Sequence, residues 1–265
     1  MAISLIDTHC HLSFFDQKKQ KEIIENATRH HIIKIITVGT SIESSEKSIQ
    51  LAKQEKILYA SAGIHPSEIQ PSKTFNFIKN TSQLTKLAAN KEVIAIGECG
   101  LDYSRIKNDD FETRKKQQEL FQIHLFIAKK FNLPIIIHSR DTFDDTIKIL
   151  DKNNFPFSKV VFHCWTYDLE KAQKMIARGA FLSFTGIVTY PNAKKIQETV
   201  SKIPLDHFFL ETDSPFLSPQ SKRKKQNQPK FLIETVEKIA ALRQTSPKQI
   251  GDITSKNAIN FFNLD

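Results

Sequence analysis

The chain has 265 residues, of which 40% are hydrophobic and 25% charged, and it carries a formal net charge of +9. This is the composition of a globular protein that buries a sizeable core, and it excludes a largely disordered chain. No segment approaches the roughly 18 consecutive apolar residues of a membrane helix. Met1 leads into an apolar run without the basic segment of a secretory signal. We therefore expect a cytoplasmic protein with no membrane association and no obligate protein partner.

Short apolar runs rich in β-branched residues alternate with longer amphipathic segments along the whole chain. The eight runs span residues 3–6, 32–38, 57–62, 93–96, 134–137, 160–162, 180–184 and 207–210. Segment 112–131 is typical of the intervening stretches, because Leu120, Phe121 and Leu125 recur near the 3.6-residue period of a helix. Strands that alternate with helices indicate parallel β-α units.

Eight β-α units close into a (β/α)8 TIM barrel, a fold of roughly 250 residues. We therefore predict that residues 1–265 form a single α/β domain of this architecture with parallel strands. The chain beyond residue 227 predicts additional C-terminal helices on the outside of the barrel, the last within 246–262. An open doubly wound sheet is the alternative, but neither a G-x-G-x-x-G motif nor a P-loop follows the first run.

Side chains of the types that bind metals follow six of the eight apolar runs. In chain order they are His9 and His11 after the first run, His65 after the third, Glu98 after the fourth, His138 after the fifth, His163 after the sixth and Asp213 after the eighth. The C-terminal ends of parallel strands converge on the face of a barrel that carries the active site. Crowded ionisable groups are costly there without a compensating cation or substrate. The pattern therefore predicts a metal centre at the barrel mouth.

The spacing His9-x-His11 places both imidazoles on one side of an extended strand, so that both can bind one ion. Such a pair is a weak signal alone, and it gains weight from His138, His163 and the two carboxylates. Four histidines and two carboxylates exceed the needs of one tetrahedral zinc, which predicts two divalent cations. Glu98 is the candidate bridge, because the fourth strand lies between the first strand and the fifth and sixth.

The motifs DTHCHL, GIHP, IGECGLDY, IIHSRD, FHC and ETDSP occur in this order along essentially the whole chain. Together they resemble the TatD family of metal-dependent deoxyribonucleases, which are amidohydrolase-like barrels. The resemblance implies cleavage of DNA phosphodiester bonds with two divalent metal ions, which are Mg, Mn or Zn in different members. It also implies the ligands: His9, His11 and Asp213 for one ion, His138 and His163 for the other, and Glu98 as the bridge.

Two positions depart from the family pattern. Cys99 stands where the family usually has Ile after the bridging glutamate, on the strand face turned away from the metals. In the loop after the eighth run, Arg223 is followed by Lys224 where the family often has Gly. If that Gly is needed for a positive φ, the loop takes another path, and the substrate contact of Arg223 changes with it.

The expected reaction starts from a water whose pKa the cations lower from about 15.7 to about 7. Asp213 is the predicted catalytic base, since a ligand carboxylate keeps a free oxygen for the proton of that water. His65 is not needed for the metals and is predicted to contact a phosphate oxygen, with a hydrogen-bonded loop histidine as the alternative. Glu211 shares a strand with Asp213 at period 2 and is a candidate to hold a metal ligand.

Further substrate contacts are predicted beside the metal ligands. Arg140 follows a ligand by two residues and is expected to pair with phosphate, or else with Asp141 or Asp144. Arg223 lies in the basic run 222–225 and is expected to contact the DNA backbone, although such a run is commonly only solvated. The aromatic candidates for stacking on a base, with lid packing as the alternative, are Trp165, Tyr167, Phe14 and Phe15.

Three functions remain to be compared. The leading one is a deoxyribonuclease acting on single strands or ends, because a barrel mouth does not easily admit a duplex. The basic charge favours a DNA partner modestly, since lysine-rich helix faces that serve only solubility give the same net charge. A small-molecule amide, ester or lactone hydrolase is the alternative, because metals polarise carbonyl and phosphoryl oxygens alike. A non-enzymatic nucleic-acid binder is disfavoured, since binding alone has no use for a complete ligand set.

Overall fold

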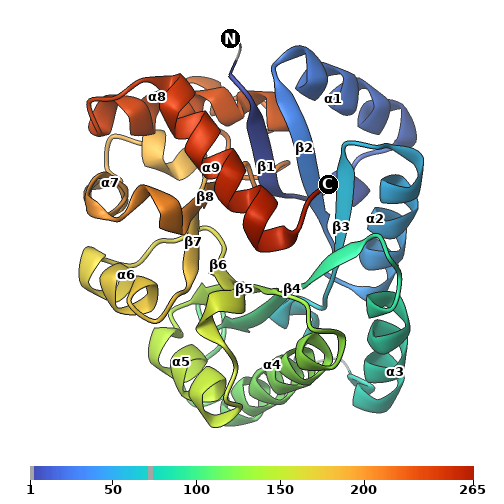
Figure 1. Ribbon diagram of the computed structural model, residues 1–265. Helices are drawn as coiled ribbons and strands as arrows, with labels where there is room; N and C mark the ends of the chain where they lie inside the picture. Colours follow the sequence, from blue (N-terminus) through green and yellow to red (C-terminus); the bar gives the residue numbers. More distant parts are fainter. Residues whose placement is uncertain (1–2, 71–73) are drawn as a thin grey trace.

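Eight parallel strands follow one another around a ring in the computed structural model, which describes residues 3–70 and 74–265 (Figure 1). The strands are β1 (Leu5–Cys10), β2 (Ile32–Val38), β3 (Leu58–Ala62), β4 (Val93–Asp102), β5 (Ile135–Arg140), β6 (Val160–Phe162), β7 (Phe181–Phe184) and β8 (Phe208–Leu210). Each pairs with the next in sequence. The order β1 to β8 without a crossover is that of a barrel, and it excludes the doubly wound sheet.

The ring closes between the end of β1 and the segment that follows β8. The backbone N–H of Asp213 donates to the carbonyl of His9 at 2.8 Å, and that of His11 donates to Ser214 at 2.7 Å. These bonds bring residues about 200 positions apart in the sequence to one seam. The predicted (β/α)8 TIM barrel is therefore confirmed.

Helices surround the strands and alternate with them in the described part of the chain. They are α1 (Gln17–Arg29), α2 (Ile42–Gln54), α3 (Phe77–Ala88), α4 (Phe111–Phe131), α5 (Phe143–Lys152), α6 (Leu169–Ile176), α7 (Lys194–Lys202), α8 (Leu232–Leu242) and α9 (Pro247–Phe262). Many begin at a residue whose side chain accepts a hydrogen bond from an N–H of the first turn. These capping residues are Asp16, Ser41, Asn76, Asp110, Asp168 and Ser246.

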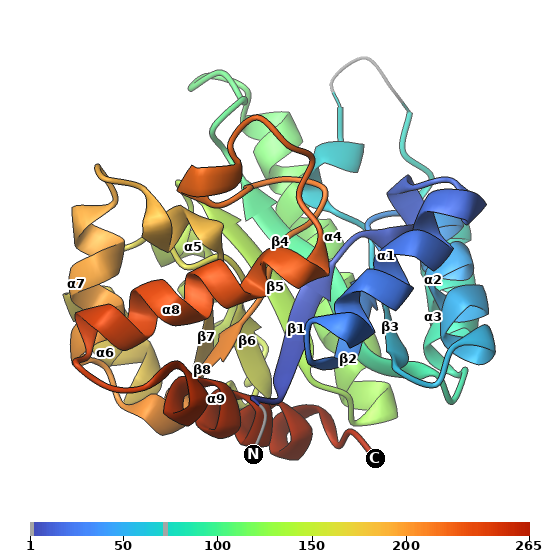
Figure 2. The same cartoon turned by 90° about the horizontal axis from the view of Figure 1, so that it is seen from above.

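The last helix, α9, crosses the end of the barrel where the strands begin (Figures 1 and 2). Ala258 and Phe262 of this helix join the cluster of apolar side chains inside the barrel, which includes Ile36, Ile136 and Phe209. The additional C-terminal helices are thus present. However, α9 plugs the barrel from below rather than covering its outer side, because its apolar face matches the open end of the inner core.

Strand β4 continues six residues beyond the apolar run 93–96, to Asp102. Its polar end pairs with β5, with Gly100 opposite His138 and Asp102 opposite Arg140. The apolar pattern underestimates β1, β4 and β5, because polar side chains such as His9, Glu98 and His138 interrupt the apolar sequence near the end of each strand. These extensions carry the side chains of interest.

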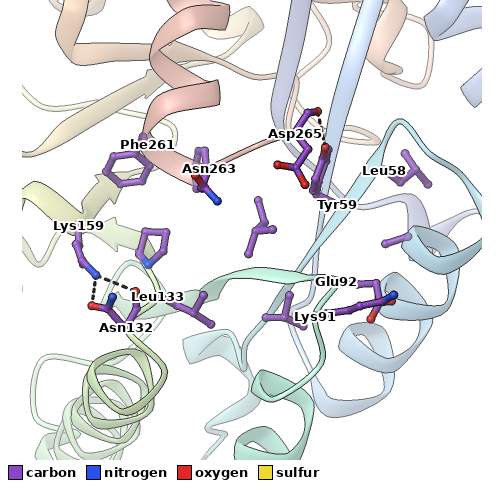
Figure 3. A pocket seen from close by; sticks show the side chains of 15 residues that line it. Leu58, Tyr59, Lys91, Glu92, Asn132, Leu133, Lys159, Phe261, Asn263 and Asp265 are labelled. Carbon is purple, nitrogen blue, oxygen red and sulfur yellow. Dashed lines mark hydrogen bonds between the residues drawn. The ribbon is translucent and has the colours of Figure 1, made fainter.

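A pocket of about 640 Å³ lies at the opposite end, between the starts of β3 and β4 and the C-terminal residues (Figure 3). Two of its polar side chains have partners: Lys159 Nζ donates to the carbonyl of Asn132 at 2.8 Å, and the Tyr59 hydroxyl donates to that of Asp265 at 3.0 Å. Neither histidine nor cysteine is among the described residues that line it. The histidines that follow the strands are grouped at the other end of the barrel. Among the described helices, none is both long and apolar enough to cross a bilayer.

Candidate metal centre

All six predicted metal ligands lie together at the C-terminal ends of the strands. Their ligand atoms fall into groups within 4.8 Å of one another: His9, His11 and Asp213; His9, Glu98 and His163; and Glu98 and His138 with His65. The loops after β4 and β8 rise above this end of the barrel in Figure 2. Residues from six strand ends thus share one small volume, as the order of the strands requires.

Glu98 occupies the middle of the cluster. Its Oε2 lies 3.3 Å from His9 Nε2 and 3.7 Å from His11 Nε2. Its Oε1 faces the other way, 2.9 Å from His163 Nε2 and 3.0 Å from His138 Nδ1. The side chain is 5% exposed. One carboxylate oxygen is therefore directed at each of two imidazole pairs, which is the arrangement of a bridging ligand.

Asp213 completes the side of the cluster that contains His9 and His11. Its Oδ1 lies 3.2 Å from His11 Nε2 and 3.7 Å from His9 Nε2. Its backbone is left-handed, with φ of +56°, a conformation that non-glycine residues rarely adopt. The bond from its N–H to the carbonyl of His9 and the bond from Phe216 N–H to its own carbonyl, at 2.9 Å, fix this turn. The turn directs the carboxylate back toward the strands.

His65 lies closer to the centre than the sequence indicates. Its Nε2 is 3.5 Å from Glu98 Oε1, and its ring centroid is 4.4 Å from that of His138. Its Nδ1 is occupied by Ser67, whose backbone N–H donates to it at 3.1 Å. The structure therefore leaves Nε2 as the free atom, directed at the cluster, and His65 can contact either a cation or a substrate there.

Two carboxylates lie beside His138 and His163, on the side of each ring that faces away from Glu98. Asp102 Oδ2 lies 3.1 Å from His138 Nε2, and Glu211 Oε1 lies 3.3 Å from His163 Nδ1. Glu211 is 1% exposed and also accepts hydrogen bonds from Cys164 N–H and the Ser183 hydroxyl. The second nitrogen of each ring thereby faces an acid. Carboxylates in this position fix the orientation of a histidine and raise its basicity toward a metal.

Close approach of β4 to β5 places Asp102 beside His138. Gly100 has φ of +129°, and a Cβ at this position would lie 2.1 Å from the carbonyl oxygen of His138. Only glycine fits between the strands here. Asp102 was not predicted as a site residue from the sequence. The signal was present, because Glu98 and Asp102 are four residues apart on one strand and share a face.

The electrostatics of the cluster favour ionised acids. Burial would raise the pKa of Glu98, but His163, His65 and His138 around it hold that pKa well below its usual range. Burial likewise opposes ionisation of Asp213, and the contact with His11 lowers its pKa. Burial lowers the pKa of His65 to about 4, which makes it neutral at pH 7. Burial opposes protonation of His11, His138 and His163, but the carboxylates beside them raise the pKa of each of these rings. A divalent cation bound here would therefore displace their protons, because a metal needs neutral imidazoles and anionic oxygens as ligands.

A further observation indicates that these side chains suit divalent cations. His9 Nε2 is buried and makes no well-aligned hydrogen bond to any described residue, although two carboxylates lie within 3.7 Å. A buried polar atom without a partner is costly, and a cation between imidazole and carboxylate would satisfy it. Nitrogen and oxygen ligands of this kind suit zinc and other first-row metals, with the carboxylates also suiting Mg and Mn.

The predicted substrate contacts fare differently. Arg140 is exposed at the end of β5 and pairs with no carboxylate of the described chain, so the predicted ion pair with Asp141 or Asp144 is absent there. Arg223 is exposed on the loop after β8, with its guanidinium 4.4 Å from the centre of the Tyr190 ring. Both guanidinium groups therefore remain available to an anionic substrate.

Trp165 does not lie where the sequence interpretation placed it. Its side chain is 3% exposed, and its ring packs edge-on against Phe143, Phe162 and Tyr167 at centroid distances of 5.3 to 6.2 Å. No face of the indole is open to a nucleobase. The structure therefore argues against the predicted substrate contact, and Trp165 belongs to the core under the β6 loop.

The chain is similar to known proteins over nearly its whole length. The model of the family described as TatD related DNase matches residues 6–263. The chain belongs to the TatD family. It is 37% identical over 264 residues to an uncharacterized metal-dependent hydrolase of Buchnera aphidicola, covering 98% of this chain and 96% of that one. To the uncharacterized metal-dependent hydrolase YabD of Bacillus subtilis it is 34% identical, covering 98% and 100%.

A solved structure agrees with these relatives. The crystal structure of YjjV, a TatD homologue from Escherichia coli, superimposes with a TM-score of 0.89 at 28% identity, covering 98% of both chains. The TatD-family chain is accordingly a metal-dependent hydrolase, with candidate His, Asp and Glu clusters for divalent metal. The resemblance drawn from six short motifs is confirmed over nearly the full length.

The two departures from the family pattern have clear structural outcomes in this TatD-family barrel. Cys99 is buried, with its Sγ 3.7 Å from the carbonyl of Ile136 on the neighbouring strand, and it makes no contact with the cluster. Lys224 is not among the residues with positive φ. The loop after β8 therefore accommodates Lys in place of Gly with an ordinary backbone.

Proposed function

We propose that this TatD-family hydrolase is a deoxyribonuclease that cleaves phosphodiester bonds in single strands or at strand ends. We further propose that it uses two divalent cations and that residues 1–265 act as one domain. The ligands would be His9, His11 and Asp213 for one cation and His138 and His163 for the other, with Glu98 between them. The observation that carries the proposal is the division of the Glu98 oxygens between two imidazole pairs, at 2.9 to 3.7 Å.

Bound cations would supply Lewis-acid activation of water and neutralisation of charge on phosphate oxygens. Asp213 is suited to accept the proton of the attacking water. It is 8% exposed, its pKa lies below the ordinary value, and only its Oδ1 contacts the histidines. Its second oxygen is the one free for the proton, as a general base requires.

Three side chains around the cluster are suited to the phosphodiester. His65 directs Nε2 toward the centre, where it can contact a non-bridging phosphate oxygen. Arg140 is exposed at the end of β5 and Arg223 on the loop after β8, and both can pair with flanking phosphates. Their charge adds to a surface whose formal net charge is +9, which draws a polyanion toward the mouth.

The experiment measures cleavage of radiolabelled single-stranded DNA by the purified protein in Mg, Mn and Zn. We expect cleavage in at least one metal, and a loss on the order of 100-fold or more in Asp213→Asn, because a general base contributes that much. Asp206→Asn is the matched control, since Asp206 lies at the far end of the barrel beside His207. Absence of cleavage in every metal, or equal cleavage by Asp213→Asn, refutes the deoxyribonuclease.

A small-molecule hydrolase is the second candidate, because the same cluster polarises carbonyl oxygens. Amide, ester and lactone substrates assayed beside DNA distinguish the two. Hydrolysis of these compounds by a protein that leaves DNA intact would favour the second candidate. DNA binding without turnover would favour a protein that only binds nucleic acid.

A further inference from the structure

Two exposed phenylalanines lie at the rim of the metal centre. Phe14 ends the short helix after β1, and Phe216 lies in the loop after β8. The Phe14 ring stacks on that of His11, with centroids 5.1 Å apart and planes at 16°. The Phe216 ring stands edge-on to both, 6.0 Å from each. Residues from opposite ends of the chain thus form one aromatic corner over a proposed metal ligand.

Both rings are about half exposed, at 48% for Phe14 and 50% for Phe216. Exposed apolar surface of this kind is costly in water and is a mark of a binding site when rings are grouped. The other largely exposed phenylalanines of the described chain, Phe111 and Phe126, belong to α4 and have no aromatic contact. The corner of Phe14 and Phe216 is therefore distinguished by its grouping and by its place beside His11.

The backbone holds the corner in place. Phe14 N–H donates to the carbonyl of His11 at 3.1 Å. The carbonyl of Phe216 accepts from Nδ2 of Asn227, a fully buried residue that also donates to the carbonyl of Thr212. The rings are therefore presented on rigid turns that also carry His11 and the segment around Asp213. A preformed aromatic surface costs little conformational entropy on binding.

We propose that Phe14 and Phe216 form a stacking subsite for the nucleobase adjacent to the scissile phosphodiester. This inference rests on the proposed deoxyribonuclease function and deepens it. Every base presents a π-face to an aromatic ring, so the subsite selects for the presence of a base and not for its identity. In a nucleotide, one sugar joins the base to its phosphate. A base stacked on Phe14 and Phe216 would therefore hold its phosphate close to the metal centre, because Phe14 contacts the proposed ligand His11.

Charge on the same loop favours a nucleotide over an uncharged apolar partner. Arg223, Lys224 and Lys225 follow Phe216 by seven to nine residues, and all three are exposed. The Ser218 hydroxyl donates to the carbonyl of Lys225 at 2.6 Å, which folds the basic part back beside the aromatic part. Aromatic rings next to cations are the combination by which proteins bind single-stranded nucleic acid.

The test compares two radiolabelled strands of equal length, oligothymidine and a strand of tetrahydrofuran units that has the phosphates without the bases. The variants are Phe14→Ala, Phe216→Ala and Phe216→Tyr, with Phe126→Ala as the matched control. For each alanine variant at the corner we expect KM for oligothymidine to rise about tenfold, since each base stack is worth this order. We expect little change in kcat and an unchanged KM for the base-free strand. Phe216→Tyr retains the ring and is expected to behave as the wild type.

Equal losses on both strands, or none on either, overturn the stacking subsite while leaving the deoxyribonuclease intact. Thermal melting of each variant separates a folding defect from a binding defect, because a misfolded protein loses activity on both strands. If the wild-type protein cleaves neither strand in any metal, the proposed function fails and the subsite fails with it.

Discussion

Three histidines of the centre have a carbonyl or a carboxylate beside the nitrogen that faces away from the cluster. His11 Nδ1 lies 3.1 Å from the carbonyl of Val38, while Glu211 and Asp102 hold His163 and His138. These partners fix the orientation of each ring, so its other nitrogen points toward the cluster without a change of rotamer. Carboxylates and backbone carbonyls that do not contact the substrate therefore also contribute to the geometry of the metal centre.

His124 shows the same device in a purely structural setting. It is fully buried in α4, its Nδ1 donates to the carbonyl of Leu120 at 2.7 Å, and its Nε2 accepts from Ile64 N–H at 2.9 Å. The contact with Ile64 requires the neutral ring, because a protonated Nε2 cannot accept a hydrogen bond. Burial lowers the pKa of His124 to about 4, compared with 6.5 in an unfolded chain. The acceptor contact holds the backbone next to His65.

We predict that His124 makes stability fall as the solution becomes acidic. The unfolded chain binds the proton near pH 6.5 and the folded chain only near pH 4, so the contribution is complete above 6.5 and is lost as pH falls toward 4. Between pH 7 and pH 5 the loss is about 2 kcal/mol. Urea unfolding at both pH values, for wild type and His124→Gln, measures it as a difference. Parallel pH profiles for the two proteins would contradict this prediction.

Helix α4 joins two of the loops that form the barrel mouth. Gln117 is 2% exposed, and its Oε1 accepts from Asp102 N–H at 3.0 Å while its Nε2 donates to the carbonyl of Pro66 at 3.1 Å. One amide therefore connects the end of β4 to the residue after His65. His124 adds the bond to Ile64 about two turns further along the same helix face.

We predict that Gln117→Leu lowers the free energy of unfolding by about 2 to 4 kcal/mol. The side chain is similar in size, but the change leaves the buried carbonyl of Pro66 and the partly buried N–H of Asp102 unpaired. A buried unpaired group costs about 1 to 3 kcal/mol, and a partly buried one costs less. Hydrolytic activity should fall as well, because His65 and Asp102 lose their common support. Denaturant unfolding and turnover are compared with Gln122→Leu, whose amide bonds only to the carbonyl of Gln118 in its own helix. Equal stability of the two variants would rule out the connection.

The molecule as a whole concentrates ionisable groups at one end of an apolar barrel. The inner core and α9 close the other end. The ends of five strands must stay in place for the proposed ligand atoms to meet, namely those of β1, β4, β5, β6 and β8. Cations bound there would therefore stabilise the fold as well as serve the reaction.

We predict that chelation lowers the thermal unfolding midpoint of the metal-loaded protein by on the order of 5 to 10 °C. Metal at about 100 times its Kd contributes about 2.7 kcal/mol, and each kcal/mol corresponds to roughly 2 to 4 °C in a protein of this size. Melting is recorded with and without EDTA, alongside metal analysis of the same samples. Glu98→Gln should bind less metal and shift less with EDTA. A midpoint that is unchanged after proven metal removal would disprove the linkage.

The order of the elements and the metal-binding side chains at the strand ends could be predicted from the sequence alone. Apolar periodicity reports local backbone geometry, and parallel β-α units have few ways to close, so the barrel and the approach of His9, Glu98, His163 and Asp213 followed. Glu211 was also within reach, because strand period 2 places it beside Asp213.

Contacts between distant segments and the paths of the loops emerge only in the folded molecule. There Trp165 is buried, His65 lies beside Glu98, and Phe14 contacts Phe216. Helix α9 also turns under the barrel there. None of these contacts leaves a periodic trace in the chain, because each arises from packing between segments that are far apart in sequence and not from the repeat of a single element.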